Sequence, residues 1–395
     1  MSKSAAYFRL FRAVIGTLSC GVCVMGVFAA EPAGPSWKMQ YFYDKVQQTF
    51  VFADLSCPDN QHCYAIGVIS DKGGKSKPEF LRTSDGGANW VDSELKEVPD
   101  SLYFLDAMHG WFTSDKGIWR TVDGGGKWDK ISKEVGIEDL YFADASHGYA
   151  AGVGGRLTET TNGGQDWHEL AIGNLPYPKD QISFEWVTFL GPDHGILAGS
   201  AFPYGQRVSM RPDWMDPERA RRMHSPPTVS FVAETKDGGK TWQAGKPFSN
   251  YGNLLRARCL ADGRALVTLQ FDDGSPWPSH LEQVDPETGK SILIFRRKDR
   301  VIKDALQLKS HDYIIATIEP PGTSTALPIP GKIKMLRGHG GDSWVEDPVD
   351  YRGVARNLIL AASPDEHMWV ATDTGMILGF VPGPQGDSAP HPEGR

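Results

Sequence analysis

One eight-residue pattern recurs in this sequence and restricts the folds open to it. The pattern reads Thr-x-Asp-Gly-Gly-x-x-Trp, with Asn for Asp in one copy, and its copies begin at Thr83, Thr121, Thr160 and Thr235. A worn fifth copy at 337–344 keeps the glycine pair and the tryptophan. Asp-Gly or Asn-Gly supplies the positive φ angles of a tight hairpin turn, and the Trp ring can fold back over that turn. Each copy therefore predicts a β-hairpin.

A second repeat precedes the first one along the chain. It consists of an apolar strand, a short polar turn that often ends in His-Gly, and another apolar strand. The clear copies begin at Leu102, Leu140 and Val187, and weaker copies begin near 52, 257, 306 and 358. Seven such units predict an all-β fold, a seven-bladed β-propeller of four-stranded antiparallel blades over residues 37–380. The last unit ends after three strands, so we expect 37–43 to complete it and close the ring.

Composition and charge agree with this fold. The 44 Gly and 27 Pro favour many turns, while 40% hydrophobic and 11% aromatic residues can supply a core. The formal net charge of −8 argues against general binding to nucleic acid or anionic membranes. We expect residues 381–395, which are Pro, Gly and polar residues for the most part, to form a disordered tail.

The first 29 residues have the pattern of a secretory signal peptide. Lys3, Arg9 and Arg12 precede an uncharged apolar run that ends at Ala30. An uncleaved anchor helix and a lipid anchor on Cys20 are the alternatives. We therefore expect an exported protein, periplasmic or extracellular.

The cysteines fit an oxidising compartment. Cys57 and Cys63 lie close together in sequence and predict a disulfide that clamps a hairpin turn, with two reduced thiols as the alternative. Cys259 has no neighbour in sequence, and we expect a small buried apolar residue rather than a nucleophile.

The Thr-x-Asp-Gly-Gly-x-x-Trp copies resemble the Asp-box, or BNR, repeats of sialidases, sortilin-type receptors and several glycosidases. Together with the segment Phe-Ala-Asp-Ala-Ser-His-Gly-Tyr-Ala-Ala-Gly at 142–152, they resemble more closely the photosystem II stability and assembly factor family. This resemblance covers most of 50–380 and implies a seven-bladed propeller of the thylakoid lumen or the bacterial envelope. The long insertion at 200–228 departs from the photosynthetic members.

Loop length distinguishes the two faces of the expected ring. The box turns and the His-Gly turns are short and share one face, which we call the box face. The connections between the second and third strands of a blade, and between blades, are long and share the opposite face, the long-loop face. Binding residues concentrate on such loops. The candidate partner-binding residues, which are basic or aromatic, are Tyr204, Arg207, Arg211, Trp214, Arg219, Arg221, Arg222, Arg296, Arg297, Arg352 and Arg356, with Arg300 beside them.

The repeated box residues are expected to be structural, because one residue type at one position of many blades indicates architecture. They are Asp85, Trp90, Asp123, Trp128, Asn162, Trp167, Asp237 and Trp242. The same argument applies to His109, His147 and His194. A catalytic use of the carboxylates and a metal site at the histidines are the alternatives.

We therefore expect a monomeric, non-enzymatic propeller that binds an envelope or membrane protein complex and supports its assembly or stability. No catalytic residue, metal or cofactor is predicted, because the sequence has no nucleophile elbow, phosphate loop or zinc signature. The alternative is a glycoside hydrolase of sialidase type, which would need three arginines, a Tyr nucleophile with a Glu partner and an acidic residue.

Overall fold

The computed structural model describes residues 34–202, 228–249, 252–271, 275–319, 330–341 and 343–383. The predicted signal peptide, residues 203–227 of the predicted insertion and residues 384–395 of the predicted tail lie outside the described residues. In the described part of the chain, no helix combines the length and the apolar character that crossing a membrane requires.

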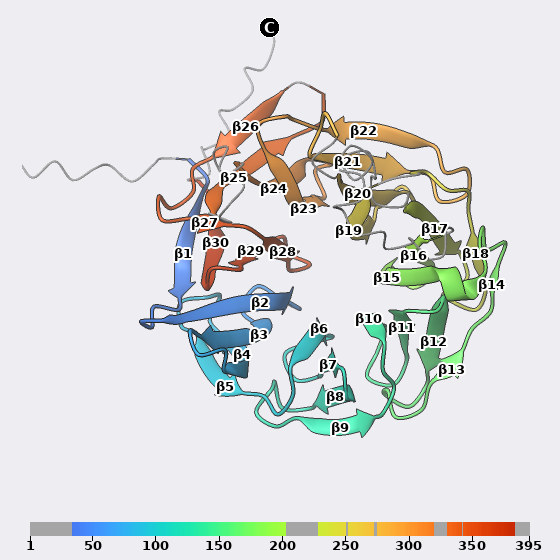
Figure 1. The fold of residues 1–395 in the computed structure, drawn as a ribbon, viewed down its shortest axis with the longest axis horizontal. Helices are drawn as coiled ribbons and strands as arrows, with labels where there is room; N and C mark the ends of the chain where they lie inside the picture. Colours follow the sequence, from blue (N-terminus) through green and yellow to red (C-terminus); the bar gives the residue numbers. More distant parts are fainter. Residues whose placement is uncertain are drawn as a thin grey trace, which may run out of the picture.

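Seven β-sheets surround a central axis, as Figure 1 shows. The first three blades are β2 (Gln48–Ser56) to β5 (Val91–Glu94), β6 (Pro99–Phe104) to β9 (Asp129–Ser132), and β10 (Ile137–Phe142) to β13 (His168–Glu169). Their middle strands are β3 (Cys63–Asp71), β4 (Ser76–Thr83), β7 (Gly110–Ser114), β8 (Gly117–Thr121), β11 (Gly148–Gly152) and β12 (Arg156–Thr160).

The fourth, fifth and sixth blades continue the same order from the axis outward. Their strands are β15 (Ile182–Leu190), β16 (His194–Ala201), β17 (Val229–Thr235) and β18 (Trp242–Ala244); β19 (Asn253–Cys259), β20 (Ala265–Gln270), β21 (Ser279–Val284) and β22 (Ser291–Phe295); and β23 (Val301–Gln307), β24 (Tyr313–Ile318), β25 (Gly331–Gly338) and β26 (Trp344–Asp347). The seven-bladed antiparallel propeller predicted from the repeats is confirmed.

The N-terminal strand closes the ring, as predicted. The seventh blade holds β28 (Leu358–Ala362), β29 (Met368–Thr372) and β30 (Met376–Val381), and β1 (Ser36–Phe42) pairs antiparallel with β30 as its outermost strand. Trp37 is buried and its ring centroid lies 5.3 Å from that of Phe380. The indole N–H of Trp369 donates to Gln40 Oε1 at 3.0 Å, so side chains as well as backbone join the two ends of the ring.

Two predicted connections contain additional short elements. The connection between β13 and β15 includes β14 (Ile172–Gly173), which pairs parallel with β18, and a short 3₁₀ helix, η1 (Lys179–Gln181). The connection between β26 and β28 includes β27 (Val354–Ala355), which pairs with β25. These elements extend two blades to five strands, because a connection that runs beside an open sheet edge can satisfy its backbone groups there.

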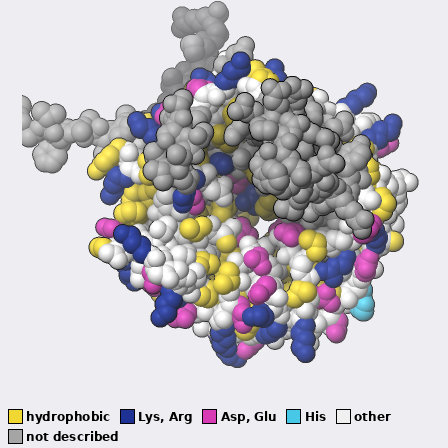
Figure 2. Space-filling model, viewed as in Figure 1, with side chains coloured by type: hydrophobic (Ala, Val, Ile, Leu, Met, Phe, Trp, Pro, Cys, Tyr) yellow, Lys and Arg dark blue, Asp and Glu magenta, His cyan; other side chains and the backbone are white. Residues whose placement is uncertain are grey.

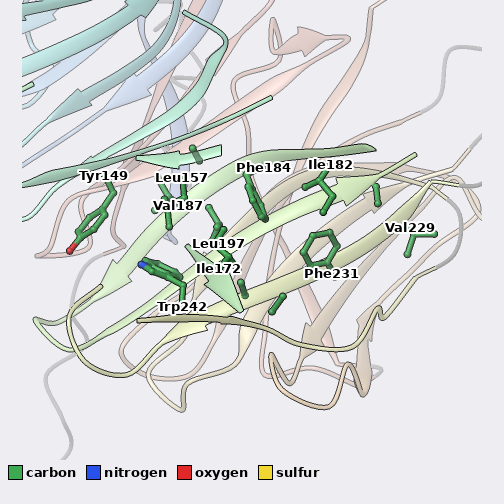
Figure 3. Close-up of a cluster of buried hydrophobic side chains, with 14 residues drawn as sticks. Tyr149, Leu157, Ile172, Ile182, Phe184, Val187, Leu197, Val229, Phe231 and Trp242 are labelled. Carbon is green, nitrogen blue, oxygen red and sulfur yellow. The ribbon is translucent and has the colours of Figure 1, made fainter. Parts of the chain in front are cut away.

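The core lies between neighbouring blades. Every residue of β7 and of β11 is buried, because a middle strand is covered on both faces by the adjacent blades. Figure 3 shows one such layer, in which Tyr149 and Leu157 of the third blade pack against Phe184, Leu197 and Trp242 of the fourth. Burial of each large apolar side chain contributes roughly 1.5–3 kcal/mol.

The second glycine of a box fits against the preceding blade. Gly125 has a φ of +81°, and a Cβ atom there would lie 2.2 Å from the ring of Phe80. Gly239 has a φ of +89°, and a Cβ atom would lie 2.1 Å from the hydroxyl oxygen of Tyr149. Only glycine meets both conditions, so the box joins blades as well as turning the chain.

Candidate functional site

Six of the seven innermost strands carry a shift in register that turns side chains into the central channel. The shifts fall between residues 52 and 54, 99 and 102, 137 and 139, 184 and 186, 254 and 256, and 302 and 304. A bulge re-aims the side chain that it displaces. Asp54, Asp139, Arg256 and Asp304 all follow such a shift.

The displaced carboxylates bond to the next blade. Asp54 Oδ2 accepts from the backbone N–H of Leu102 at 2.8 Å, and Asp139 Oδ2 accepts from that of Val187 at 2.9 Å. Asp304 Oδ2 accepts from the backbone N–H of Leu360 at 2.9 Å. We call Asp54, Asp139 and Asp304 the channel carboxylates. Each bridges two blades, so these carboxylates help to hold the ring together.

Two arginines of the fifth blade face the same channel. The guanidinium of Arg258 donates to both carboxylate oxygens of Asp304 at 3.0 Å and from Nε to the carbonyl of Ala305 at 2.9 Å. Arg256 lies 3.5 Å from Asp304 and 4.1 Å from the ring of Trp186 in the fourth blade. The fully buried Asp304 is thus compensated by two cations, as a buried charge requires.

Burial raises the pKa of two carboxyl groups, Asp139 and Glu185, toward neutrality. Burial is the largest cause that raises the pKa of Asp139 to about 7, and the nearby Asp54 raises it further. Burial likewise raises the pKa of Glu185 to about 8, against the hydrogen bond from Ser200 and with added repulsion from Glu138. In Figure 2, Asp and Glu side chains gather near the centre of the ring, so the negative charge there increases as pH rises through this range.

Most of the predicted partner-binding residues lie outside the described residues. These are Tyr204, Arg207, Arg211, Trp214, Arg219, Arg221 and Arg222. The described candidates form two separate pairs on consecutive blade connections: Arg296 and Arg297 follow β22, and Arg352 and Arg356 lie between β26 and β28. No ion pair or hydrogen bond joins one pair to the other among the residues described here.

The described arginines are held by local partners. Arg296 stacks over the ring of Trp277 at 4.4 Å, and Arg297 pairs with Asp299 at 2.9 Å. Arg352 pairs with Asp350, and Arg356 pairs with Asp373 at 2.8 Å.

Arg300 differs from the other described candidates. Its place in a long connection predicts that it reaches solvent on the long-loop face, but it is buried and lies 3.2 Å from Asp299 and 3.6 Å from Glu346. Its position just before β23 places it against the blade rather than in solvent, so Arg300 is a packing residue.

Two aromatic side chains, the exposed Tyr351 and the half-buried Trp277, accompany these cations on the long-loop face. Tyr351 is 91% exposed and lies under the guanidinium of Arg352 at 5.6 Å. Trp277, in the connection between β20 and β21, has Lys298 at 5.1 Å in addition to Arg296. Such aromatic and cationic pairs offer stacking and charge to a ligand at once.

The predicted box residues take part in one repeated turn. In each of the four clear boxes the threonine hydroxyl donates to the Asp or Asn side chain two residues later, at 2.8 to 3.1 Å. The threonine oxygen also accepts from the backbone N–H of the second glycine at 2.8 to 3.0 Å. Hydrogen bonds from Thr241 and Thr235 lower the pKa of Asp237 to about 2. The boxes therefore use their carboxylates within the turn.

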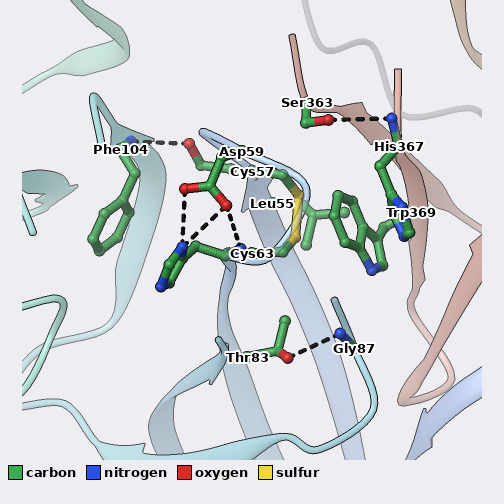
Figure 4. Close-up of a disulfide and its surroundings, with 12 residues drawn as sticks. Leu55, Cys57, Asp59, Cys63, Thr83, Gly87, Phe104, Ser363, His367 and Trp369 are labelled. Carbon is green, nitrogen blue, oxygen red and sulfur yellow. Dashed lines mark hydrogen bonds and ion pairs between the residues drawn. A yellow bond between two sulfur atoms is a disulfide. The ribbon is translucent and has the colours of Figure 1, made fainter. Parts of the chain in front are cut away.

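The predicted disulfide between Cys57 and Cys63 is present. Figure 4 shows it across the turn between β2 and β3, where Asp59 accepts from the backbone and ring of His62. Cys259 is a free cysteine and is only partly buried, whereas full burial was expected. Its Sγ lies 3.2 Å from His194 Nδ1, and burial raises its pKa to about 12, so a neutral thiol faces that histidine.

The recurring histidines belong to turns of the box face. The ring of His109 lies 2.9 Å from Asp106, and that of His147 lies 2.7 Å from Glu159. Among the described residues there is no group of three or more His, Cys, Asp or Glu side chains that could hold a metal ion. Tyr149 lies 3.4 Å from Glu159, and a Tyr beside a Glu is one requirement of the sialidase-type alternative. Tyr149 is buried, however, and donates to the carbonyl of Gly238 in the next blade at 2.8 Å, which is a structural role.

A cavity of about 360 Å³ opens on the box face. Its lining comes from the ends of the innermost strands of the fourth to seventh blades and the turns after them, and includes Leu260, Leu306, Leu308 and Pro364. The wall is mostly apolar. The cavity thus lies on the face opposite to the predicted working surface.

Sequence reasoning missed the channel carboxylates. The available signal was an Asp followed at once by Leu or Ala within the first strand of three repeats, at Asp54, Asp139 and Asp304. A simple alternation of inward and outward side chains along a strand does not include the register shift beside each Asp, so it cannot predict which way these side chains point.

Several solved structures share this fold. YCF48 bound to D1 peptide gives a TM-score of 0.53 at 14% identity over 86% of this chain and 98% of that chain. YCF48 from Cyanidioschyzon merolae gives 0.53 at 16% identity over 87% and 98%. The WD40 β-propeller domain of Doa1 gives 0.51 at 11% identity over 90% and 98%. No protein-family profile and no curated protein matches the chain. At such identities the similarity establishes the fold alone.

Proposed function

We propose that this chain is a non-enzymatic, exported β-propeller that binds a segment of another protein on its long-loop face and acts as an assembly or stability factor. The observation that carries the proposal is the pairing of aromatic rings with exposed cations on that face, at Tyr351 with Arg352 and at Trp277 with Arg296. Trp, Tyr and Arg are the residue types that dominate the energetics of protein interfaces.

The scaffold suits such a role. Bridges from one blade to the next, such as those of the channel carboxylates, fix the ring, so that loops on its face are held in place before a partner arrives. A preorganised surface loses less conformational entropy on binding. The box carboxylates are engaged in their own turns, which favours a binding function over hydrolysis at those positions.

Two further observations support the class of partner and the location. The similar fold of YCF48, a photosystem II assembly factor whose solved complex holds a D1 peptide, makes a polypeptide the ligand class to test first. The signal-like pattern over residues 1–29 and the disulfide between Cys57 and Cys63 favour an oxidising compartment outside the cytoplasm.

The test is cross-linked pull-down from an envelope fraction of the native organism. We expect Tyr351→Ala and Arg352→Glu together to reduce recovery of the partner by about tenfold, the equivalent of about 1.4 kcal/mol. Lys240→Glu, an exposed reversal within a box on the opposite face, is the matched control and should leave recovery unchanged. Equal recovery by the double variant and the wild type would remove this face from the proposal.

A further inference from the structure

One outermost strand differs from the others in its chemistry. Natural sheets protect their edges with charged side chains, and β5, β9, β26 and β1 each contain at least one ionisable residue. The strand β22, with the sequence Ser-Ile-Leu-Ile-Phe, has none. Among the outermost strands of four or more residues in the described ranges, it is the one without such a charge.

The edge of β22 is open to solvent. Ile292 is 54% exposed and Leu293 is 43% exposed, although both side chains are apolar. Within the described ranges the strand pairs with β21 on its inner side, through a ladder that runs from Val284 and Ser291 to Leu281 and Phe295, and with no strand on its outer side. Its outer side therefore presents backbone N–H and C=O groups of the kind that accept an additional strand.

Positive charge flanks this edge at both ends. Lys290 precedes the strand, and Arg296 and Lys298 follow it; all three are exposed. Arg297 lies between them but is compensated by Asp299 at 2.9 Å. Figure 1 places β22 at the upper right of the ring, and Figure 2 shows Lys and Arg side chains along that part of the rim.

We propose that β22 is a docking edge for an extended segment of a partner protein, with apolar side chains in alternation and carboxylates at its ends. Backbone pairing along β22 would give affinity, and the terminal cations would select acidic residues. Ile292 and Leu293 point to opposite faces of the strand, so the apolar side chains of the segment would pack beside Leu293 on one face. This site is on the rim of the ring, so it goes beyond the long-loop face proposed above and can exist without it.

The charges argue for a different protein rather than a second copy of this chain. If two copies paired antiparallel through β22, Lys290 of each would lie beside Arg296 of the other. Like charges in such positions disfavour a complex, whereas an acidic segment would be attracted in either strand orientation.

The test uses two short fluorescent synthetic peptides with alternating Ile and Thr, one flanked by Glu and one flanked by Lys. Binding to the whole protein is measured by fluorescence anisotropy at low ionic strength, and amide hydrogen exchange reports where the peptide binds. Leu293→Lys places a charge on the edge. Val345→Lys is the matched control, because Val345 is an exposed residue of the outermost strand β26.

We expect the Glu-flanked peptide to bind the wild type and to slow exchange over residues 291–295. Leu293→Lys should weaken that binding at least about tenfold, Val345→Lys should not change it, and the Lys-flanked peptide should bind at least about tenfold more weakly. Arg352→Glu, on the long-loop face, should leave it intact, so failure of this inference is distinguishable from failure of the proposed function.

Three outcomes would overturn the inference. They are the absence of saturable binding of the Glu-flanked peptide to the wild type, an equal loss in Leu293→Lys and Val345→Lys, and equal binding of the two peptides. Self-association of the wild type that Leu293→Lys abolishes would also overturn it, because the occupant of the edge would then be a second copy.

Discussion

Single glycines in the boxes have two separate requirements, and these can be measured apart. Gly125, in the second box, combines a positive φ with contact against the Phe80 ring. Gly154, outside the boxes in the turn between β11 and β12, has a φ of +73° with no atom within 4 Å of its would-be Cβ. We expect Gly154→Ala to cost about 1 kcal/mol through the backbone alone, and Gly125→Ala to cost about 2–4 kcal/mol because the ring must also move. Urea unfolding of both variants checks this. Equal costs would mean that the contact with Phe80 has no energetic effect.

Asp139, one of the channel carboxylates, is expected to make the free energy of unfolding depend on pH. Folding raises the pKa of Asp139 from 3.8 to about 7, so the folded state binds the proton more tightly. The stabilisation from this group is therefore complete below the unfolded pKa and is lost as pH rises through about 7. Asn can accept from Val187 and donate to Ser101, so Asp139→Asn should keep both hydrogen bonds without the charge.

We expect the free energy of unfolding of Asp139→Asn, relative to wild type, to increase between pH 4 and pH 8 by at most about 4 kcal/mol. Denaturant unfolding at both pH values measures it. Asp180→Asn, an exposed replacement in η1, serves as the comparison and should run parallel to wild type. A parallel course for Asp139→Asn as well would show that this carboxyl does not titrate between those values.

At the level of strands, β1 is the element on which closure of the ring depends. Trp37 anchors it through burial against Phe380 and through its backbone N–H, which donates to the carbonyl of Pro348 at 2.8 Å. We expect Trp37→Ala to cost about 3–5 kcal/mol and to speed hydrogen exchange in β30. Val46→Ala, in the exposed connection to β2, should change neither. Unchanged exchange in β30 of Trp37→Ala would mean that β1 is held without its tryptophan.

The strands differ in how far sequence could predict them. The boxes located the hairpins between outer strands, because Asp-Gly-Gly turns have a local cause that is visible in eight residues. The strands β14 and β27 could not be predicted, since two residues that pair only because an edge is near carry no periodic signal of their own. The bulges that turn Asp54, Asp139 and Asp304 into the channel arise from packing around the axis, which no single repeat contains.

For the whole molecule, the adjacency of the two ends of the described ring predicts that the chain can be permuted. A Cβ atom on Gly383 would lie 3.0 Å from the backbone of Gly34, so a short linker can join them. A permutant that begins at Val46 and ends at Lys45 would have seven blades each built from consecutive strands. We expect it to be monomeric, with a Tm within about 5 °C of wild type, because every strand pair is retained.

Gel filtration and thermal unfolding check the permutant. The matched variant removes residues 34–45 and leaves β30 as an open edge, so we expect it to aggregate. A permutant that aggregates in the same way would show that the original order of strands is itself required for folding.

The candidate site was less predictable than the ring. The arginines at 296, 297, 352 and 356 were found by composition and loop position, and the structure places them in two pairs with local acidic or aromatic partners. Their partners could not be predicted, because Trp277 and Asp373 come from other segments of the chain. The sequence Ser-Ile-Leu-Ile-Phe of β22 shows that the strand has no charge, but only the topology identifies that segment as an outermost strand.

The pairing of β1 with β30 also sets an order in time. Gln40 and Trp369 are 329 residues apart, so the strand that is synthesised first receives its neighbour only when the chain is almost finished. Contacts so distant in sequence form late. Until then the row of blades has an unpaired strand at each end, and an interrupted chain keeps both. An incomplete copy is therefore marked by its own open edges, which makes it recognisable to chaperones and proteases in a way that the finished ring is not.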